Sequence, residues 1–431
     1  FQGDHLFAAT AHTYRGALAS MMVSSDHGRT FHRARGARSE LLDGRWKVLD
    51  VSHGAVLLLV QRHDELPSVG DLFVSDADGL VYTLSLRDCV ETSFARVEGV
   101  DGGYVVQQLS GLGGADGPAR KAAVEAPRLR TLITHNRGAA WSLLRAPAAA
   151  ASSTRAGKPC VLADGCSLQL AAHAAASGRS IVVSRADAAG VVLAVGHPGP
   201  HLRHDAPESW LTYLSRDGGR SWEEAAPVAM HGAIGAHASV LLLAPDAIRL
   251  GTASGFGADP AAAGGADASS LRFSTDEGLT WESVPLGDVA IPPEAYTADE
   301  LLAVEAVAGV PHAPLSFLLH AERRPALPPN ASAAAAAAAA RARQGVLLTV
   351  RVEVAAAAAR PCSFADAEEW GSDVCALGRR TKRLRRRRAA NCLGAPPALL
   401  ASAAWTVVRH TPAPSAPCPC TASDYECDFD H

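Results

Sequence analysis

Ser215-Arg-Asp-Gly-Gly-Arg-Ser-Trp222 is the stretch that decides the fold, and it directly follows the apolar, aromatic run 210–214. It predicts a strand that leads into a tight turn. Ser215 and Asp217 can accept hydrogen bonds from the N–H groups of that turn. Gly219 can adopt the positive φ that the turn requires, and Trp222 can cover it. We call this eight-residue pattern a box.

The spacing of this box recurs along the chain. In chain order the boxes span residues 24–31 (box 1), 75–82 (box 2), 134–141 (box 3), 215–222 (box 4) and 274–281 (box 5). Box 3 has Asn136 in place of the aspartate, and box 2, the most degenerate, has Ala77 there. The residues that we assign to the structure of the boxes are Ser24, Asp26, Gly28, Asn136, Gly138, Trp141, Ser215, Asp217, Gly219, Trp222, Ser274, Asp276, Gly278 and Trp281.

Successive box glycines lie 51, 59, 81 and 59 residues apart. Each interval leaves room for about four strands and their turns, which is the size of a propeller blade. We therefore expect an all-β fold of consecutive four-stranded blades over residues 1–354, with each box at a turn between two strands. The stretch 345–354 alternates like a half-buried strand and is expected to be the last strand of these blades.

Composition limits the partners of the chain. A formal charge of −4 on 431 residues gives no case for nucleic acid or a membrane surface. No uncharged apolar run of about 18 residues is present, and the first residues lack the plan of a signal peptide. They resemble sequence from the middle of a domain, so we expect the chain to be part of a longer protein. We expect no cofactor.

Cysteines define a second region. Six of the nine lie in the last 70 residues, with one C-x-C pair and otherwise wide gaps, which favours disulfides over zinc. Residues 355–431 are therefore expected to form a small disulfide-rich module in an oxidising, lumenal or extracellular compartment. Cys160 and Cys166 are predicted to pair by proximity, whereas Cys89 has no evident mate and is expected to be a buried thiol or to pair outside this chain. Asn330 lies in a possible glycosylation sequon.

The run Arg379-Arg-Thr-Lys-Arg-Leu-Arg-Arg-Arg-Arg388 is the most basic segment of the module. We favour a solvated basic strand or loop. A patch for glycosaminoglycan or another anionic partner and a site for a basic-specific protease are the alternatives. A nuclear signal conflicts with the compartment that the cysteines indicate.

The cysteine module carries a family resemblance. Its residues 362–370, 375–378, 392 and 418–429 look like the start of the ten-cysteine module of VPS10-domain receptors, the sortilin family, and residues 97–105, 131–134 and 166–170 are similar to that family in the same order. The resemblance implies the second half of a ten-bladed propeller, hence an open arc, followed by a truncated module. It also implies a type I sorting receptor that carries soluble cargo, such as vacuolar or lysosomal hydrolases or propeptides, from the Golgi to the endosome or vacuole.

The resemblance further implies how the module is linked and anchored. Cys362 would pair with Cys392 and Cys375 with Cys418, while Cys420 and Cys427 would reach partners beyond residue 431. Cytosolic adaptors and the membrane would be contacted only through a tail and a transmembrane segment outside this chain. In peptide-binding relatives an arginine lies five residues before box 1, where this chain has Ala19, so we assign no ligand-binding residue.

An enzyme is the competing hypothesis, because sialidases and some glucanases carry similar boxes. Glycosidases need two carboxyl groups about 5 to 9.5 Å apart, or a tyrosine nucleophile with arginines. The box aspartates are expected to be committed to their own turns, so we predict no catalytic residue. His197, His201 and His204 could suggest a metal, but the intervening Pro198-Gly-Pro200 excludes a helix, and we expect a loop with exposed histidines. We predict no metal site.

Overall fold

The computed structural model describes residues 6–11, 19–36, 46–51, 55–61, 68–76, 78–110, 127–147, 160–172, 180–249, 270–284, 300–310, 313, 315–325, 347–354, 360–371, 379–380, 382–390, 392–394 and 416–417. Strands dominate these residues, and their helical turns are short 3₁₀ segments. The prediction of an all-β fold is confirmed. No helix in the described part is long and apolar enough to cross a membrane.

Five mainly antiparallel sheets carry the described strands up to residue 353. The first contains β1 (Leu6–Ala11), β2 (Ala19–Ser24) and β3 (His32–Arg33). The second contains β4 (Arg35–Gly36), β5 (Trp46–Asp50), β6 (Leu57–Gln61), β7 (Val69–Ser75), β8 (Val81–Val90), β9 (Ala95–Arg96), β10 (Tyr104–Ser110), β11 (Arg128–Thr134) and β12 (Ser142–Leu143), with β4 parallel to β8.

The third sheet contains β13 (Ser167–Ala171), β14 (Val183–Ser184), β15 (Val192–Gly199), β16 (Leu211–Ser215) and β17 (Glu223–Ala226). The fourth contains β18 (Met230–Ile234), β19 (Leu241–Pro245), β21 (Leu271–Ser274) and β22 (Glu282–Val284). The fifth contains β20 (Ala247–Arg249), β23 (Glu300–Gly309), β24 (Ser316–Pro325) and β25 (Leu347–Glu353). The 3₁₀ turns are η2 (Glu91–Ser93), η4 (Leu162–Asp164), η5 (Pro207–Ser209), η6 (Ala236–Ala238) and, in the module, η10 (Phe364–Asp366).

Every box follows one strand and precedes the next in the same sheet. Box 1 joins β2 to β3, box 2 joins β7 to β8, box 3 joins β11 to β12, box 4 joins β16 to β17, and box 5 joins β21 to β22. This placement confirms the expected strand–box–strand units. The last sheet contains none of these boxes, although β25 occupies the stretch predicted as the final strand and alternates between half-buried and exposed side chains over residues 348–353.

The second sheet departs from the expectation of separate four-stranded blades. Its nine strands join the units of boxes 2 and 3, because β8 pairs with β7 and, through Cys89 opposite Gln108, also with β10. Just before this double pairing Asp88 has φ +57°, and the β7–β8 register is irregular nearby. One long strand that bends at Asp88 therefore serves two neighbouring units.

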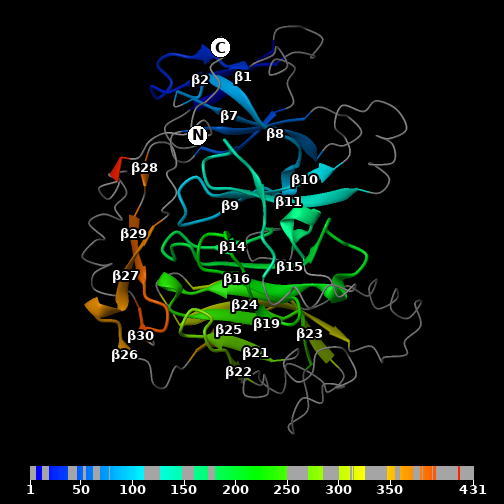
Figure 1. Ribbon diagram of the computed structural model, residues 1–431, viewed down its shortest axis with the longest axis vertical. Helices are drawn as coiled ribbons and strands as arrows, with labels where there is room; N and C mark the ends of the chain where they lie inside the picture. Colours follow the sequence, from blue (N-terminus) through cyan, green and yellow to red (C-terminus); the bar gives the residue numbers. More distant parts are fainter. Residues whose placement is uncertain are drawn as a thin grey trace.

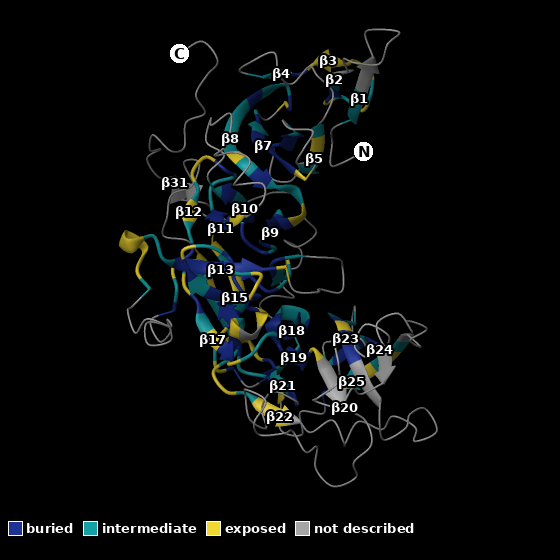
Figure 2. Ribbon diagram, turned by 90° about the vertical axis from the view of Figure 1, so that its right-hand side faces the viewer, coloured by how far each residue is buried: buried dark blue, intermediate teal, exposed yellow. Residues whose placement is uncertain are grey.

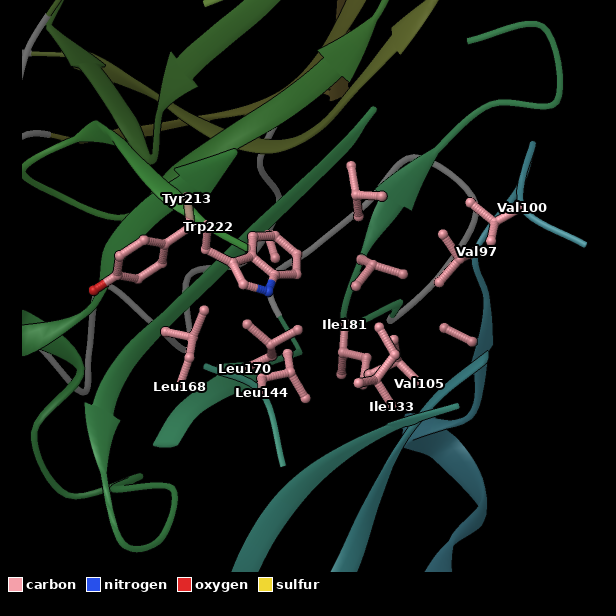
Figure 3. Packing of buried hydrophobic residues seen from close by; sticks show 14 residues of the cluster. Val97, Val100, Val105, Ile133, Leu144, Leu168, Leu170, Ile181, Tyr213 and Trp222 are labelled. Atoms are coloured by element: carbon pink, nitrogen blue, oxygen red, sulfur yellow. The ribbon is translucent and has the colours of Figure 1, made fainter. Parts of the chain in front are cut away.

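The sheets follow one another along an arc (Figure 1). The first sheet lies at one end and the sheet of β23 to β25 at the other, so the described sheets do not close into a ring. Buried residues run through the centre of the arc from sheet to sheet (Figure 2). The interface between the units of boxes 3 and 4 is an example. There Trp222 lies among aliphatic side chains from both units, including Ile133 of β11 and Leu168 of β13 (Figure 3).

The module lies along one side of this arc, shown in orange in Figure 1. Its described strands form three pairs: β26 (Arg360–Pro361) with β30 (Cys392–Leu393), β27 (Ala367–Gly371) with β29 (Lys382–Arg386), and β28 (Arg379–Arg380) with β31 (Ala416–Pro417). We call the β27–β29 pair the basic hairpin, because Arg383, Arg385 and Arg386 lie on its second strand.

Candidate functional site

Box 4 shows how the sequence builds its turn. The Ser215 hydroxyl oxygen accepts from the N–H groups of Gly219, at 2.8 Å, and Asp217, at 3.3 Å. The Asp217 carboxylate accepts from the Ser215 hydroxyl, at 2.9 Å, and from the N–H of Ser221, at 2.8 Å. Trp222 donates its indole N–H to the Gly219 carbonyl, at 3.1 Å, and is only 6% exposed. The polar groups of the box therefore satisfy one another.

The same bonds recur in boxes 1, 3 and 5. In box 1 the Ser24 hydroxyl and both the N–H and the hydroxyl of Thr30 donate to Asp26. Ser274, Asp276 and Thr280 repeat this arrangement in box 5, and Asn136 takes the acceptor role in box 3. Hydrogen bonds from Thr30, first from its hydroxyl, hold the pKa of Asp26 well below its usual range. A carboxylate held ionised in this way is a poor general acid.

Box 2 keeps the turn by a different route. The Asp76 carboxylate accepts from the N–H groups of Leu80, at 2.8 Å, and Val81, at 3.2 Å. Asp76 thus supplies, one residue earlier, the acceptor that Ala77 lacks, a role that the sequence analysis missed. The signal was present, because an aspartate immediately after Ser75 can also bond to backbone groups further along the turn.

The box glycines also connect neighbouring units. Gly138, Gly219 and Gly278 have φ between +84° and +91°. A Cβ at Gly219 would lie 2.5 Å from Ile133 Cδ1, and one at Gly278 would lie 2.2 Å from Leu214 Cδ2. Ile133 immediately precedes box 3 and Leu214 immediately precedes box 4. Each of these glycines therefore lets its turn lie against the strand that leads into the preceding box.

The arginine run packs against boxes 4 and 5 and the segments beside them, which corrects the expectation of a solvated basic segment. Arg383 pairs with Asp101, in the turn between β9 and β10, and Arg388 pairs with Glu223 of β17. Arg385 donates to the carbonyl of Arg216 in box 4, at 2.6 Å. These carboxylate and carbonyl partners, together with those of Arg386, lie on three successive units of the arc. Because they cover several of the arginines, only part of the run faces solvent.

Arg386 and Glu277 form the buried centre of this contact. Their side chains are 0% and 1% exposed, and Arg386 Nε lies 3.6 Å from Glu277 Oε1. Arg386 also donates to the carbonyls of Thr275, at 2.8 Å, and Ala238, at 2.8 Å. Arg216 pairs with the other oxygen of Glu277. One carboxylate from box 5 is thus shared by a guanidinium of box 4 and one of the module.

Glu277 holds this position at a strained backbone conformation. Its φ is +55°, in the left-handed region that side chains other than glycine, asparagine and aspartate rarely adopt. Burial of an ionised pair also carries a desolvation cost, which close partners must offset. The pairing was not predictable from local sequence, because the two residues are 109 positions apart (386 − 277).

Trp370 forms the other contact point of the basic hairpin. A Cβ at Gly190 would lie 2.6 Å from Trp370 Cζ2, so only a glycine lets the indole lie this close to the turn between β14 and β15. The Arg385 guanidinium lies over the ring, 5.3 Å from its centroid. The indole therefore contacts both the backbone at Gly190 and the cation of Arg385.

The histidines correct another expectation. His197 is 4% exposed within β15, not in an exposed loop. Its Nε2 accepts from the N–H of Arg203, at 2.9 Å, which leaves Nδ1 to donate to the Pro198 carbonyl. Burial lowers the pKa of His197 and of His201, whereas His204 is exposed. Within the described ranges no three potential ligands come together as a metal site.

Two disulfides are present in the described chain. Cys160 and Cys166 are joined with an S–S distance of 2.01 Å, and Cys362 and Cys392 with 2.05 Å. Cys89 is a buried free thiol, and burial raises its pKa. The remaining candidates, Cys375, Cys418, Cys420, Cys427 and Asn330, lie outside the described residues, and their assignments stay predictions.

A small apolar cleft lies where the third sheet meets β18. Its lining residues are Ala171, Ser180, Ile181, Val182, Val183, Leu193, Ala194, Val195, Thr212, Met230 and Gly232. The hydroxyl of Thr212 donates to the Val228 carbonyl and that of Ser180 to the Val182 carbonyl. The cleft contains no carboxyl group, so it does not offer the pair that a glycosidase requires.

Solved structures with related shapes are only weakly similar. They include YCF48 from Cyanidioschyzon merolae, with 12% identity, a TM-score of 0.31 and coverage of 74% of each chain. Another is the α-L-arabinofuranosidase Arb93A from Fusarium graminearum, with 11% identity, a TM-score of 0.24 and coverage of 82% of this chain and 90% of the other. TM-scores this low do not establish a common fold.

Sequence relatives are more informative. The vacuolar protein sorting/targeting protein 10 of Aspergillus clavatus is 25% identical over 408 residues, which cover 89% of this chain and 23% of the relative. The sortilin-related receptor of Oryctolagus cuniculus is 22% identical over 412 residues, which cover 89% of this chain and 15% of the relative. The chain thus spans less than a quarter of the length of either relative.

Family profiles match most of the chain. The profile described as "Sortilin, neurotensin receptor 3" matches residues 1–295, and the profile of its C-terminal part matches residues 330–431. Boxes 1 to 5 fall within the first match, and the Cys362–Cys392 bridge and the basic hairpin fall within the second. The chain belongs to the VPS10 (sortilin) family, whose members include proteins named as a vacuolar protein sorting/targeting protein and a sortilin-related receptor.

Proposed function

We propose that the chain is part of the lumenal ligand-binding region of a type I sorting receptor. The receptor would carry soluble protein cargo, such as vacuolar or lysosomal hydrolases or propeptides, from the Golgi to the endosome or vacuole. Membership of the VPS10 family along residues 1–295 and 330–431 carries this proposal. In it, residues 1–354 are the C-terminal blades of the propeller and residues 355–431 begin the cysteine module.

The geometry supports a binding surface over a catalytic centre. In boxes 1, 4 and 5 the aspartates accept hydrogen bonds from their own turns, and each of these boxes joins two strands of a different sheet. Carboxylates dispersed along an arc cannot act on one glycosidic bond. We propose that the boxes serve stability, and that cargo contacts the surfaces that the packed units present.

A cargo-sorting assay tests the proposal. Cells that lack the parent receptor should secrete a soluble vacuolar hydrolase, and the receptor that contains this chain should restore its retention. The lumenal region should also capture that hydrolase directly in a purified binding assay. Normal retention without the receptor, together with no direct binding, would contradict the proposal.

A hydrolysis assay tests the competing enzyme. The purified lumenal region should leave chromogenic sialosides and glucans unchanged over the time in which a sialidase or a glucanase control consumes them. Hydrolysis that disappears in a folded Asp217→Asn variant would show that the box carboxylates do chemistry and would overturn the structural assignment.

A further inference from the structure

The arginine run lies inside a disulfide-closed loop. Cys362 and Cys392 are joined across a separation of 30 residues, and the four successive arginines 385–388 fall between them. A run of four arginines is the kind of sequence that an endoprotease with acidic subsites binds, because each guanidinium group can pair with a carboxylate of the enzyme.

In the docked hairpin this sequence is not available to a protease. An endoprotease binds its substrate as an extended strand, and the side chains of the substrate enter separate subsites of the enzyme. Here β29 already pairs with β27, and the side chain of Arg386 is 0% exposed. The next residues form a turn in which the N–H of Ala390 donates to the Arg387 carbonyl, at 3.1 Å, and Ala389 has φ +66°. Residues 385–388 must therefore leave boxes 4 and 5 before the chain can be cut there.

Two of the contacts that hold the run in place involve different residues. Glu277 faces Arg386 in the buried centre, and Trp370 contacts both the backbone at Gly190 and the guanidinium of Arg385. Because the two contacts share no residue, we expect the loss of either to leave the other intact, so each can be tested separately. Glu369 provides a matched control, because its bond to Lys382, at 3.0 Å, belongs to the same hairpin, with side chains that are 67% and 64% exposed.

We propose that residues 385–388 are a latent processing site for an endoprotease specific for paired basic residues. The site becomes a substrate when the basic hairpin leaves boxes 4 and 5. Hydrolysis breaks the amide bond between Arg388 and Ala389, with the hydroxyl of water added to the Arg388 carbonyl carbon and a proton to the Ala389 nitrogen. Because Cys362 and Cys392 lie on opposite sides of the cut, the products remain one disulfide-linked molecule.

Cleavage would also make undocking persistent. Arg386 donates to the carbonyls of Ala390, at 2.6 Å, and Cys392, at 3.1 Å, and so organises the turn that the cut would open. After the cut, Arg386 and these two acceptors belong to different chains. The turn would then close only with the entropy cost of ordering two free ends.

The test compares cleavage rates under native conditions. The purified chain and its Glu277→Gln, Trp370→Ala and Glu369→Gln variants are incubated with a subtilisin-like endoprotease that requires paired basic residues. When opening is fast, the cleavage rate follows the population of the open state. We expect Glu277→Gln and Trp370→Ala to be cut at least about 10-fold faster than wild type, and Glu369→Gln to be cut at the wild-type rate.

Gels and end sequencing identify the product. A cut after Arg388 should give a new N-terminus at Ala389 and two bands only under reducing conditions, and Trp370→Ala combined with Arg388→Gln should not give this cut. Near-UV circular dichroism verifies that the blades of each variant remain folded, and Trp370→Ala serves if Glu277→Gln does not fold. Equal cutting of all four proteins, or no cutting of a folded variant whose β29 amides exchange rapidly, would overturn the proposal.

Discussion

Replacement of Gly219 by alanine tests whether the box glycines lock neighbouring units together. The new methyl group would meet two penalties. At φ +91° a residue with a Cβ loses about 1 kcal/mol from its backbone alone. In addition, the Cβ would lie 2.5 Å from Ile133 Cδ1, and Ile133 is 3% exposed within a packed interface, so it has little room to move. Overpacking of this kind costs about 1–3 kcal/mol.

Gly165 offers a matched control for the backbone term. Its φ is +74°, but a Cβ there would have no neighbour within 4 Å. Urea unfolding followed by tryptophan fluorescence should therefore show a loss of about 2–4 kcal/mol for Gly219→Ala and about 1 kcal/mol for Gly165→Ala. Equal losses in the two variants would refute the idea that Gly219 is required for contact between units.

Three further predictions concern the same units. Asp217→Ala should lower the free energy of unfolding by about 1–3 kcal/mol in urea titrations, because the N–H of Ser221 loses its acceptor, while cargo binding by the folded protein stays the same. Trp222→Ala should cost about 3–5 kcal/mol by the same measurement, since the indole is buried between two units. Burial, with a smaller contribution from the charge of Arg220, lowers the pKa of His135 to about 4. The unfolded chain therefore binds this proton first, and stability falls with falling pH from about 6.5 toward 4. Between pH 7 and 5.5 the loss from His135 should be about 1 kcal/mol, and it should disappear in His135→Asn; a pH dependence unchanged by that substitution would contradict the assignment.

Local chemistry explains which parts of the fold were predictable. A box contains within eight residues its acceptors, its positive-φ glycine and its aromatic cover, so each turn could be located from sequence alone. Because these contacts are local, a neighbouring residue can also supply them: in box 2 Asp76 provides the acceptor that Ala77 lacks. The bend at Asp88 was not predictable, because it depends on β8 pairing with strands on both sides, and the sequence of one strand does not specify two partners.

The sites that were wrongly predicted depend on distant residues. A run of arginines is solvated by default, and only carboxylates and carbonyls from other units reverse that expectation for Arg386. His197 is buried for a similar reason: Pro198 and Gly199 do exclude a helix, but they continue β15 opposite β13 instead of forming an exposed loop. In both cases local composition predicted the absence of a helix correctly and the exposure incorrectly.

Docking of the basic hairpin changes how the arc should unfold. In a stack of repeated units each unit contacts its neighbours, and stability is approximately a sum of units and interfaces. The contacts of Gly219 with Ile133 and of Gly278 with Leu214 have this nearest-neighbour character. The basic hairpin does not, because one short strand contacts Asp101 in the unit of box 3, Arg216 in box 4 and Glu277 in box 5. Opening either interface between these units must also break contacts of the hairpin, so the three units should open together and not one at a time.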